Sequence, residues 1–168
     1  EKDAKAALLD LARFSPTYVL PPGFPPVFQR EFDKAKKRLE KQRAAGKMTA
    51  RERIDALLDE GTFQEIGLFR KNRTTSFGMD KADMPADGVV TGTGAVLGRP
   101  VHLASQDFTV VGGSAGETHS LKVVEMMQGA LKCGTPFVFI NDSGGARIQE
   151  GIDSLHGYGA VFYENVKL

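Results

Sequence analysis

The fold is decided by one stretch of sequence, residues 137–151, which reads FVFINDSGGARIQEG. Its first four residues are apolar without interruption, and a short run of this kind is typical of a strand buried on both faces of a sheet. Pro136 precedes the run, and Gly144 and Gly145 follow it closely, so we expect the strand to end in a tight turn. The stretch therefore predicts a buried strand that leads through a glycine turn into a helix.

Other elements precede this strand, and one follows it. Residues 88–104 predict a β-hairpin whose turn uses residues 98–100. A glycine-rich segment, residues 112–116, then leads into a helix whose apolar face comprises Leu121, Val124, Met127 and Leu131. A last helix is expected to bury Leu155, Val161 and Phe162. Strand, helix, strand and helix in this order indicate a right-handed crossover unit on a mostly parallel sheet, which is an α/β fold.

The N-terminal part carries a basic amphipathic helix. Its apolar residues recur at helical spacing and share one face: Phe28, Phe32, Ala35 and Leu39. Residues 30–53 contain ten basic and four acidic side chains, so this surface attracts a polyanion. Thr49 and Glu52 are spaced as a capping box at the start of a second helix. We therefore divide the chain into an arm with a basic helix, residues 1–45, and a domain over residues 46–168.

Composition favours one soluble domain with a sizeable core. The 168 residues are 41% apolar and 26% charged, close to globular averages, with a net charge of +1. No run approaches the roughly 18 consecutive apolar residues of a membrane helix, and the pattern of a secretion signal is not seen. The single cysteine, Cys133, is expected to be buried and reduced, and the histidines form no metal-ligand cluster. We expect a protein of the cytoplasm, or of the mitochondrial matrix in a eukaryote, without a structural metal.

The glycine turn has the properties of a site that stabilises an oxyanion. Gly144 and Gly145 let the backbone approach a ligand closely, and amides at a strand-to-helix turn can donate hydrogen bonds to developing negative charge. Removing the proton next to a thioester produces such a charge. An equally good alternative is a purely structural turn in which Asp142 caps the next helix.

Several basic residues are candidates for ligand contacts, each beside a structural alternative. Lys47 and Arg51, together with the basic helix, are suited to binding nucleotide phosphates. A helix face that is simply solvated accounts for the same charges equally well. Arg147 is suited to a phosphate or a carboxylate, and the favoured alternative is an ion pair with Asp142 or Glu150. A catalytic histidine is a minority interpretation, because no nucleophile motif accompanies His102, His119 or His156.

Five blocks, in order, resemble the carboxyltransferase subunits of propionyl-CoA carboxylase, methylmalonyl-CoA decarboxylase and transcarboxylase. Any one block alone is a weak signal, whereas the ordered set is specific. The resemblance runs from about Lys47 to the C-terminus. The blocks are TARERI (49–54), FGMD (77–80), PADGVVTG (85–92), SQDFTVVGGSAGE (105–117) and NDSGGARIQEG (141–151).

The resemblance implies a crotonase-like N-terminal carboxyltransferase half, truncated and preceded by a helical extension. By similarity, the thioester pocket would be lined by Gly144, Gly145 and Ala146. It would be flanked by Gly112, Gly113, Ser114 and Ala115. The phosphates that Lys47 and Arg51 would meet are then those of coenzyme A. A second glycine-rich segment that completes the oxyanion site is expected beyond Leu168.

The implied reaction is carboxyl transfer between biotin and the α carbon of a short acyl-CoA such as propionyl-CoA or methylmalonyl-CoA, through an enolate. Biotin would arrive on a separate carrier protein. The rest of the active site would come from another copy of the subunit, in a dimer or hexamer. A decarboxylase of this family would touch a membrane only through partner subunits.

Two other functions are compatible with the same residues. A crotonase-like hydratase or isomerase would share the turn and need a catalytic carboxylate, for which Glu150 is the nearby candidate. A nucleic-acid-binding helix at residues 28–53 is less favoured, because no aromatic or recognition motif accompanies the charge. Residues 1–45 are in addition expected to contact a neighbouring subunit, since apolar side chains between prolines need cover: Tyr18, Val19, Leu20 and Phe24.

Overall fold

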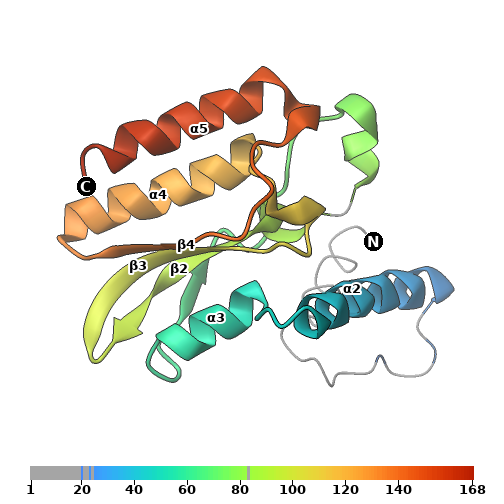
Figure 1. Cartoon of the computed structure of the whole chain (residues 1–168), viewed down its shortest axis with the longest axis horizontal. Helices are drawn as coiled ribbons and strands as arrows, with labels where there is room; N and C mark the ends of the chain where they lie inside the picture. Colours follow the sequence, from blue (N-terminus) through green and yellow to red (C-terminus); the bar gives the residue numbers. More distant parts are fainter. Residues whose placement is uncertain (1–19, 21–22, 24, 83) are drawn as a thin grey trace.

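The computed structural model describes residues 20, 23, 25–82 and 84–168. They form a small sheet with helices on both faces (Figure 1). Helix α4 and then α5 are layered on one face, α3 lies on the other, and α2 extends beyond α3. The helices and strands are α2 (Pro26–Ala44), α3 (Ala50–Leu57), β1 (Gln64–Ile66), β2 (Val89–Val96), β3 (Arg99–Gln106), α4 (Glu117–Cys133), β4 (Phe137–Ile140) and α5 (Ile152–Asn165).

Short 3-10 helices punctuate the connections. The stretch between residues 70 and 86, which has no clear sequence period, contains η1 (Ser76–Lys81) and the start of η2 (Pro85–Gly88). Two more single turns, η3 (Val111–Gly113) and η4 (Ile148–Glu150), precede α4 and α5. Within the described ranges, none of the helices is both long and apolar enough to cross a membrane.

The sheet has the strand order β1-β2-β3-β4, and its first three strands are antiparallel. Only β4 runs parallel to its neighbour, β3. The prediction of a mostly parallel sheet is therefore wrong for this part of the chain, and only the β3–α4–β4 crossover has the expected form. Among the described strands β4 lies at an edge, so residues 137–140 are half-buried and not enclosed on both faces.

A two-residue turn explains why β2 and β3 are antiparallel. Leu97 and Gly98 connect them with φ angles of 51° and 76°, both in the left-handed region that tight hairpins favour. So short a turn returns the chain antiparallel, whereas a parallel neighbour needs a long crossover such as α4. The turn predicted at residues 98–100 was placed one residue late, because Arg99 already pairs with Val96.

The N-terminal helices form as their sequence patterns predict. Helix α2 buries Phe32, Ala35 and Leu39 along one face. The capping box at α3 is confirmed: the Thr49 side chain accepts from the Glu52 amide, and the Glu52 carboxylate accepts from the Thr49 amide at 2.7 Å.

Leu20 is 5% exposed and packs against Phe32 and Ala35, so the expectation that it needs cover from outside the chain is wrong. The other three apolar arm residues, and a short helix expected before residue 15, lie outside the described residues.

Two apolar clusters fill opposite faces of the sheet. Because successive strand residues point to opposite faces, Val90 and Leu103 meet Ile54 of α3, whereas Val89 and Ala104 meet the α4 side. Each fully buried aliphatic side chain contributes about 1.5–3 kcal/mol relative to exposure. These two clusters hold α3 and α4 against the strands that end near residues 106 and 141.

The buried surface of α4 differs from the predicted stripe, because this helix packs against both the sheet and α5 (Figure 1). Val124 and Met127 are buried as expected, but Leu121 and Leu131 are 44% and 47% exposed. Cys133, at the C-terminal end of the helix, is exposed, so the prediction of a buried thiol is wrong.

Small residues set the packing of α5 on α4. A Cβ atom on Gly157 would lie 2.7 Å from the Ser120 side chain, so the two helices approach closely at that point. Val161 is half-buried, whereas Leu155 and Phe162 are exposed, contrary to prediction. A contact built on glycine and serine carries no hydrophobic period that a sequence pattern can reveal.

Candidate active site

Two glycine-rich segments that are far apart in sequence lie side by side after β3 and β4. We call residues 142–147 the bend and residues 112–115 the flanking segment. The Gly144 amide donates to the Gly112 carbonyl, and the Ala115 amide donates to the Gly145 carbonyl, both at 2.9 Å. The Arg147 amide donates in turn to the Ala115 carbonyl at 2.9 Å. The structure therefore brings together the two groups of residues that the resemblance implies for a thioester pocket.

Within the described residues, this pairing leaves two amides of the bend without a hydrogen-bond partner, those of Ser143 and Ala146. The amides of Gly144 and Gly145 are used, the second by the Ser143 hydroxyl at 3.0 Å. The Ala146 amide has no hydrogen-bond partner in the part of the chain that the structure describes. Ala146 pairs with Ala115 in an isolated parallel bridge, in which the neighbours of Ala146 make the hydrogen bonds. Its own amide therefore points away from the flanking segment.

Glycine is required at two of these positions for different reasons. A Cβ atom on Gly113 would lie 2.1 Å from the Asp142 carbonyl oxygen, so the bend and the flanking segment touch backbone to backbone there. Gly145 has a φ angle of 110°, which side-chain-bearing residues rarely adopt. Gly144, in contrast, has open space around it, because a methyl group added there would meet only the Gly112 carbonyl oxygen, at 3.6 Å.

A buried ion cluster lies directly behind the bend. The Arg147 guanidinium is fully buried and donates to the Asp87 carboxylate, to Glu150 Oε1 at 2.8 Å and to the Ser114 carbonyl at 2.7 Å. Burial raises the pKa of the Asp87 carboxyl, against the opposing effect of Arg147. The other Glu150 oxygen accepts the Glu117 amide at the start of α4, at 2.7 Å.

This cluster decides between the two roles considered for Arg147, an ion pair and a substrate contact. The predicted ion pair with Glu150 is confirmed, but Arg147 does not pair with Asp142. Its guanidinium has no exposed surface, so it cannot bind a substrate as the prediction had it. Glu150, the carboxylate that a hydratase would need, is engaged by Arg147 and by the α4 amide.

Asp142 connects the bend to the N-terminal helices. Its carboxylate accepts hydrogen bonds from Arg53, from Gln42 at 3.0 Å and from Lys47 at 3.1 Å. Burial tends to raise the pKa of Asp142, but the hydrogen bonds from Arg53 and Lys47 outweigh burial and hold it below its ordinary value. Asp142 is thus an ion-pair centre and not the helix cap that the structural alternative proposed.

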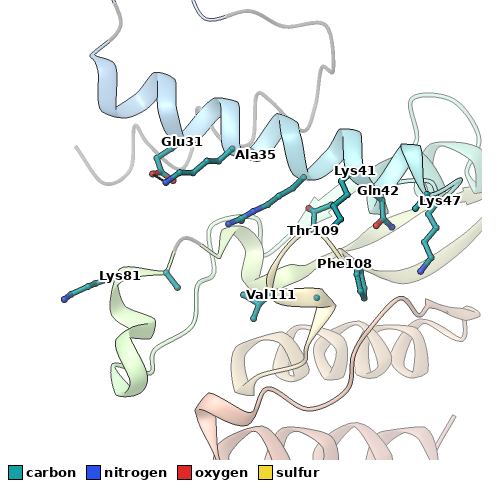
Figure 2. Close-up of a pocket in the computed structure, with 14 residues that line it drawn as sticks. Glu31, Ala35, Lys41, Gln42, Lys47, Lys81, Phe108, Thr109 and Val111 are labelled. Atoms are coloured by element: carbon teal, nitrogen blue, oxygen red, sulfur yellow. Dashed lines mark hydrogen bonds and ion pairs between the residues drawn. The ribbon is translucent and has the colours of Figure 1, made fainter.

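A cavity of about 740 Å³ lies between α2 and the start of the flanking segment. Figure 2 shows α2 above it, with Phe108, Thr109 and Val111 below. Its charged lining is one glutamate, Glu31, and five cations: Lys34, Arg38, Lys41, Lys47 and Lys81. Lys47 Nζ also lies 5.0 Å from the centre of the Phe108 ring. The lining is cationic, because five positive side chains face one negative side chain; of the five, Lys34 is paired with Glu31 and Lys47 with Asp142.

Arg51, predicted beside Lys47 as a phosphate contact, lies elsewhere. Its guanidinium makes a two-armed ion pair with Glu65, at 2.7 and 3.1 Å. It does not line the cationic cavity. Lys47 is the predicted basic residue that does, and the helix that precedes it supplies most of the other cations.

A second cavity, of about 620 Å³, lies on the α4–α5 side of the bend. The bend contributes Asp142, Ser143 and Gly145 to its wall. The rest of the lining has an apolar group, Val123, Met127, Phe139, Val161 and Phe162, and a polar group that includes Gln106 and His119. The bend is therefore bordered by open volume and is not plugged by its own side chains.

Sequence patterns gave no indication of the roles of Asp87, Gln106 and the buried His119. Asp87 lies inside one of the five blocks, PADGVVTG, yet its partner Arg147 is 60 residues away, and no local pattern links them. The other two histidines lie elsewhere. His102 Nδ1 is hydrogen-bonded to the Thr135 hydroxyl at 2.7 Å, and His156 is exposed on α5.

Comparison with known proteins shows which family this chain resembles. Residues 41–168 match the carboxyl transferase domain. The chain is 70% identical over 132 residues to the methylmalonyl-CoA carboxyltransferase 12S subunit of Propionibacterium freudenreichii subsp. shermanii, a match that covers 79% of this chain and 25% of that protein. It is 55% identical over 130 residues to the propionyl-CoA carboxylase beta chain of Roseobacter denitrificans, covering 77% and 26% respectively.

A solved structure agrees with the sequence matches. The crystal structure of transcarboxylase 12S with hydrolysed methylmalonyl-CoA bound has a TM-score of 0.78 and 70% identity, over 79% of this chain and 26% of that one. The chain thus spans about a quarter of the length of these relatives. The expected crotonase-like α/β fold class is confirmed, and the chain belongs to the carboxyl transferase domain family.

Proposed function

We propose that the protein transfers a carboxyl group between biotin and the α carbon of a short-chain acyl-CoA, propionyl-CoA or methylmalonyl-CoA. The observation that carries this proposal is the unpartnered Ala146 amide on a bend that borders open volume. The relatives named above support it, because their names state methylmalonyl-CoA and propionyl-CoA chemistry.

The bend supplies what an enolate needs. Loss of the α proton puts negative charge on the thioester oxygen, and the Ala146 amide would donate to that oxygen. Removal of one such donor typically costs about 10²–10³ in kcat. Gly144 and Gly145 contribute by allowing the thioester to approach, and their own amides hold the bend in shape. Biotin would supply the carboxyl group from a separate carrier protein, and we assign no residue of this chain to holding it.

The cationic cavity is the proposed site for the phosphates of coenzyme A. Lys34, Arg38 and Lys41 present a row of cations along α2, and Lys47 closes one end. Charge-assisted hydrogen bonds to phosphate are stronger than neutral ones, so this lining selects an anionic nucleotide. Phe108 adds an apolar wall next to Lys47.

Assembly and location complete the proposal. The remainder of the active site would come from a second copy of the protein, and residues 1–45 would contribute contacts between subunits. We place the protein in the cytoplasm, or in the mitochondrial matrix of a eukaryote, where the exposed Cys133 thiol would stay reduced. The hexamer assembly of transcarboxylase 12S supports an oligomer.

The direct test is a transfer assay on the full-length product of the gene that encodes this chain. Incubated with methylmalonyl-CoA and free biotin, it is expected to form propionyl-CoA in proportion to the biotin added. Crotonyl-CoA offered to the same preparation measures hydration. Hydration without biotin-dependent transfer would favour the hydratase alternative and contradict the proposal.

Lys41→Gln is expected to raise the KM for acyl-CoA about tenfold and to leave kcat unchanged. A phosphate contact is equally strong in the ground state and the transition state, so its loss weakens binding alone. Lys37→Gln removes the same charge from the same helix, but Lys37 does not line the cavity. Equal rises in KM for the two variants would show that only the overall charge of α2 matters.

A further inference from the structure

Asp87 is held in a strained backbone conformation at the centre of the domain. It lies in η2, where Ala86 and Asp87 have φ angles of 50° and 51°. Each side-chain-bearing residue in this left-handed region costs roughly 1–2 kcal/mol. Asp87 is completely buried. Strain of this kind persists only where the surroundings hold it, and it is found mostly at functional sites.

The Asp87 side chain holds the C-terminal end of the bend. Its carboxylate accepts from the Arg147 guanidinium and from the His119 backbone amide, the second at 2.7 Å. Arg147 directly follows Ala146 in the chain, and its second nitrogen donates to the Ser114 carbonyl at 2.7 Å. The guanidinium therefore fixes the bend relative to the flanking segment, one residue away from the unpartnered Ala146 amide.

The Asp87 backbone holds the N-terminal end of the bend through two other side chains. Its carbonyl lies 3.0 Å from His119 Nδ1, and a carbonyl only accepts, so Nδ1 carries the hydrogen. The other ring nitrogen therefore accepts from the Gln106 amide nitrogen at 3.2 Å. Gln106 Oε1 accepts in turn from the Asp142 amide at 3.1 Å. Asp142 is the first residue of the bend.

These hydrogen bonds require a neutral His119 ring, and the pKa of His119 agrees with that. Burial lowers the pKa of His119 to about 3. The imidazole is thus neutral at neutral pH, which leaves Nε2 free to accept from Gln106. A charged ring would present two N–H donors and turn the Gln106 amide round, so that its nitrogen would face the Asp142 amide.

We propose that Asp87 is a positioning residue that aims the Ala146 amide at the thioester oxygen, by holding both ends of the bend at once. This inference rests on the proposed function. One residue reaches Arg147 with its side chain and Asp142 through its carbonyl, His119 and Gln106. The Asp87 carbonyl also accepts from the second guanidinium nitrogen of Arg147 at 3.3 Å, so both parts of Asp87 hold the C-terminal end of the bend.

The test uses the full-length protein and two ligands that differ only at the reacting group. Free CoA reports the nucleotide site. A CoA thioether that carries a nitronate mimics the enolate and reports the oxyanion donor. Calorimetry gives both dissociation constants per folded molecule, so their ratio is insensitive to a loss of folded protein. Asp87→Asn keeps the size of the side chain and removes the charge that faces Arg147.

Asp59→Asn is the matched control. Asp59 accepts the Leu97 and Gly98 amides of the hairpin turn, at 3.0 and 2.7 Å, and takes no part in the bend. We expect Asp87→Asn to lower the preference for the nitronate probe about 10–100-fold while the affinity for CoA changes less than about twofold. Transfer kcat should fall to a similar extent at unchanged KM. Asp59→Asn should keep the preference.

The outcomes separate the inference from the proposed function. A folded Asp87→Asn protein that keeps the full nitronate preference overturns the inference alone. If that variant does not fold, Gln106→Met takes its place. It breaks the contacts of Gln106 to His119 and to Asp142 but leaves Asp87 and Arg147 paired, and it is expected to lose about fivefold or more of the preference. Full preference in Gln106→Met also overturns the inference. A parent protein that binds both probes equally contradicts the proposed function itself.

Discussion

Gly113→Ala is expected to lower the free energy of unfolding by about 3–5 kcal/mol. The added methyl would lie 2.1 Å from the Asp142 carbonyl oxygen, which is backbone and cannot rotate away. It would also force an alanine to keep a φ angle of 65°. The bend and the flanking segment must therefore separate, and urea unfolding followed by circular dichroism measures the loss.

Gly112→Ala is the control, because its backbone strain is matched. Gly112 has a φ angle of 62°, and a methyl group added there would meet no atom within 4 Å. Only the strain is then expected, about 1–2 kcal/mol. The difference between the two variants reports the close approach to Asp142. Similar losses in both would mean that the two segments do not touch as described.

Arg147→Met is expected to cost about 3–5 kcal/mol of unfolding free energy. Asp87 and Glu150 would remain buried without their cation, although methionine fills much of the space. Arg73→Met is the control: Arg73 pairs with Glu117 near the same end of α4, but its side chain is 72% exposed. Exposed pairs are worth about 0–1 kcal/mol, so this variant should change little.

The pH dependence of the Arg147→Met defect gives an independent check. Burial raises the pKa of the Asp87 carboxyl and Arg147 opposes that rise, so without the guanidinium the pKa of Asp87 lies further above its unfolded value. A raised carboxyl pKa contributes stability below the unfolded value and loses it as the pH rises. The difference in unfolding free energy between Arg147→Met and the parent should therefore become smaller as the pH falls from about 8 to about 5. A gap that widens on acidification would show that the buried Asp87 carboxylate does not carry the cost.

Local patterns were sufficient for the parts of the fold that depend on neighbours in sequence. The helix of residues 26–44, the Thr49–Glu52 capping box and the crossover between β3 and β4 are all formed as predicted. A helical face, a cap and a glycine turn each depend on residues within a few positions of one another. The resemblance carried by five sequence blocks likewise pointed to the family.

Local patterns did not predict which helix faces are buried or how all the strands pair. The stripe predicted on α4 assumed one buried face, but α5 covers a second one through Gly157 and Ser120. The sequence predicted the antiparallel hairpin of β2 and β3 but not that β1 would also pair with β2 antiparallel. The sheet is therefore mostly antiparallel, where a mostly parallel one was predicted.

The sequence by itself determined the elements, the glycine bend and the basic helix, since each follows from side chains close together in the chain. Only the tertiary structure decided which charges meet. Asp142 lies 89 residues from Arg53, and Arg147 lies 60 residues from Asp87. Many acidic residues suit each arginine equally well in sequence, and a buried charge takes the partner that the packing brings within hydrogen-bond distance. The free Ala146 amide has the same origin, because it is defined by the hydrogen bonds that the folded chain makes around it.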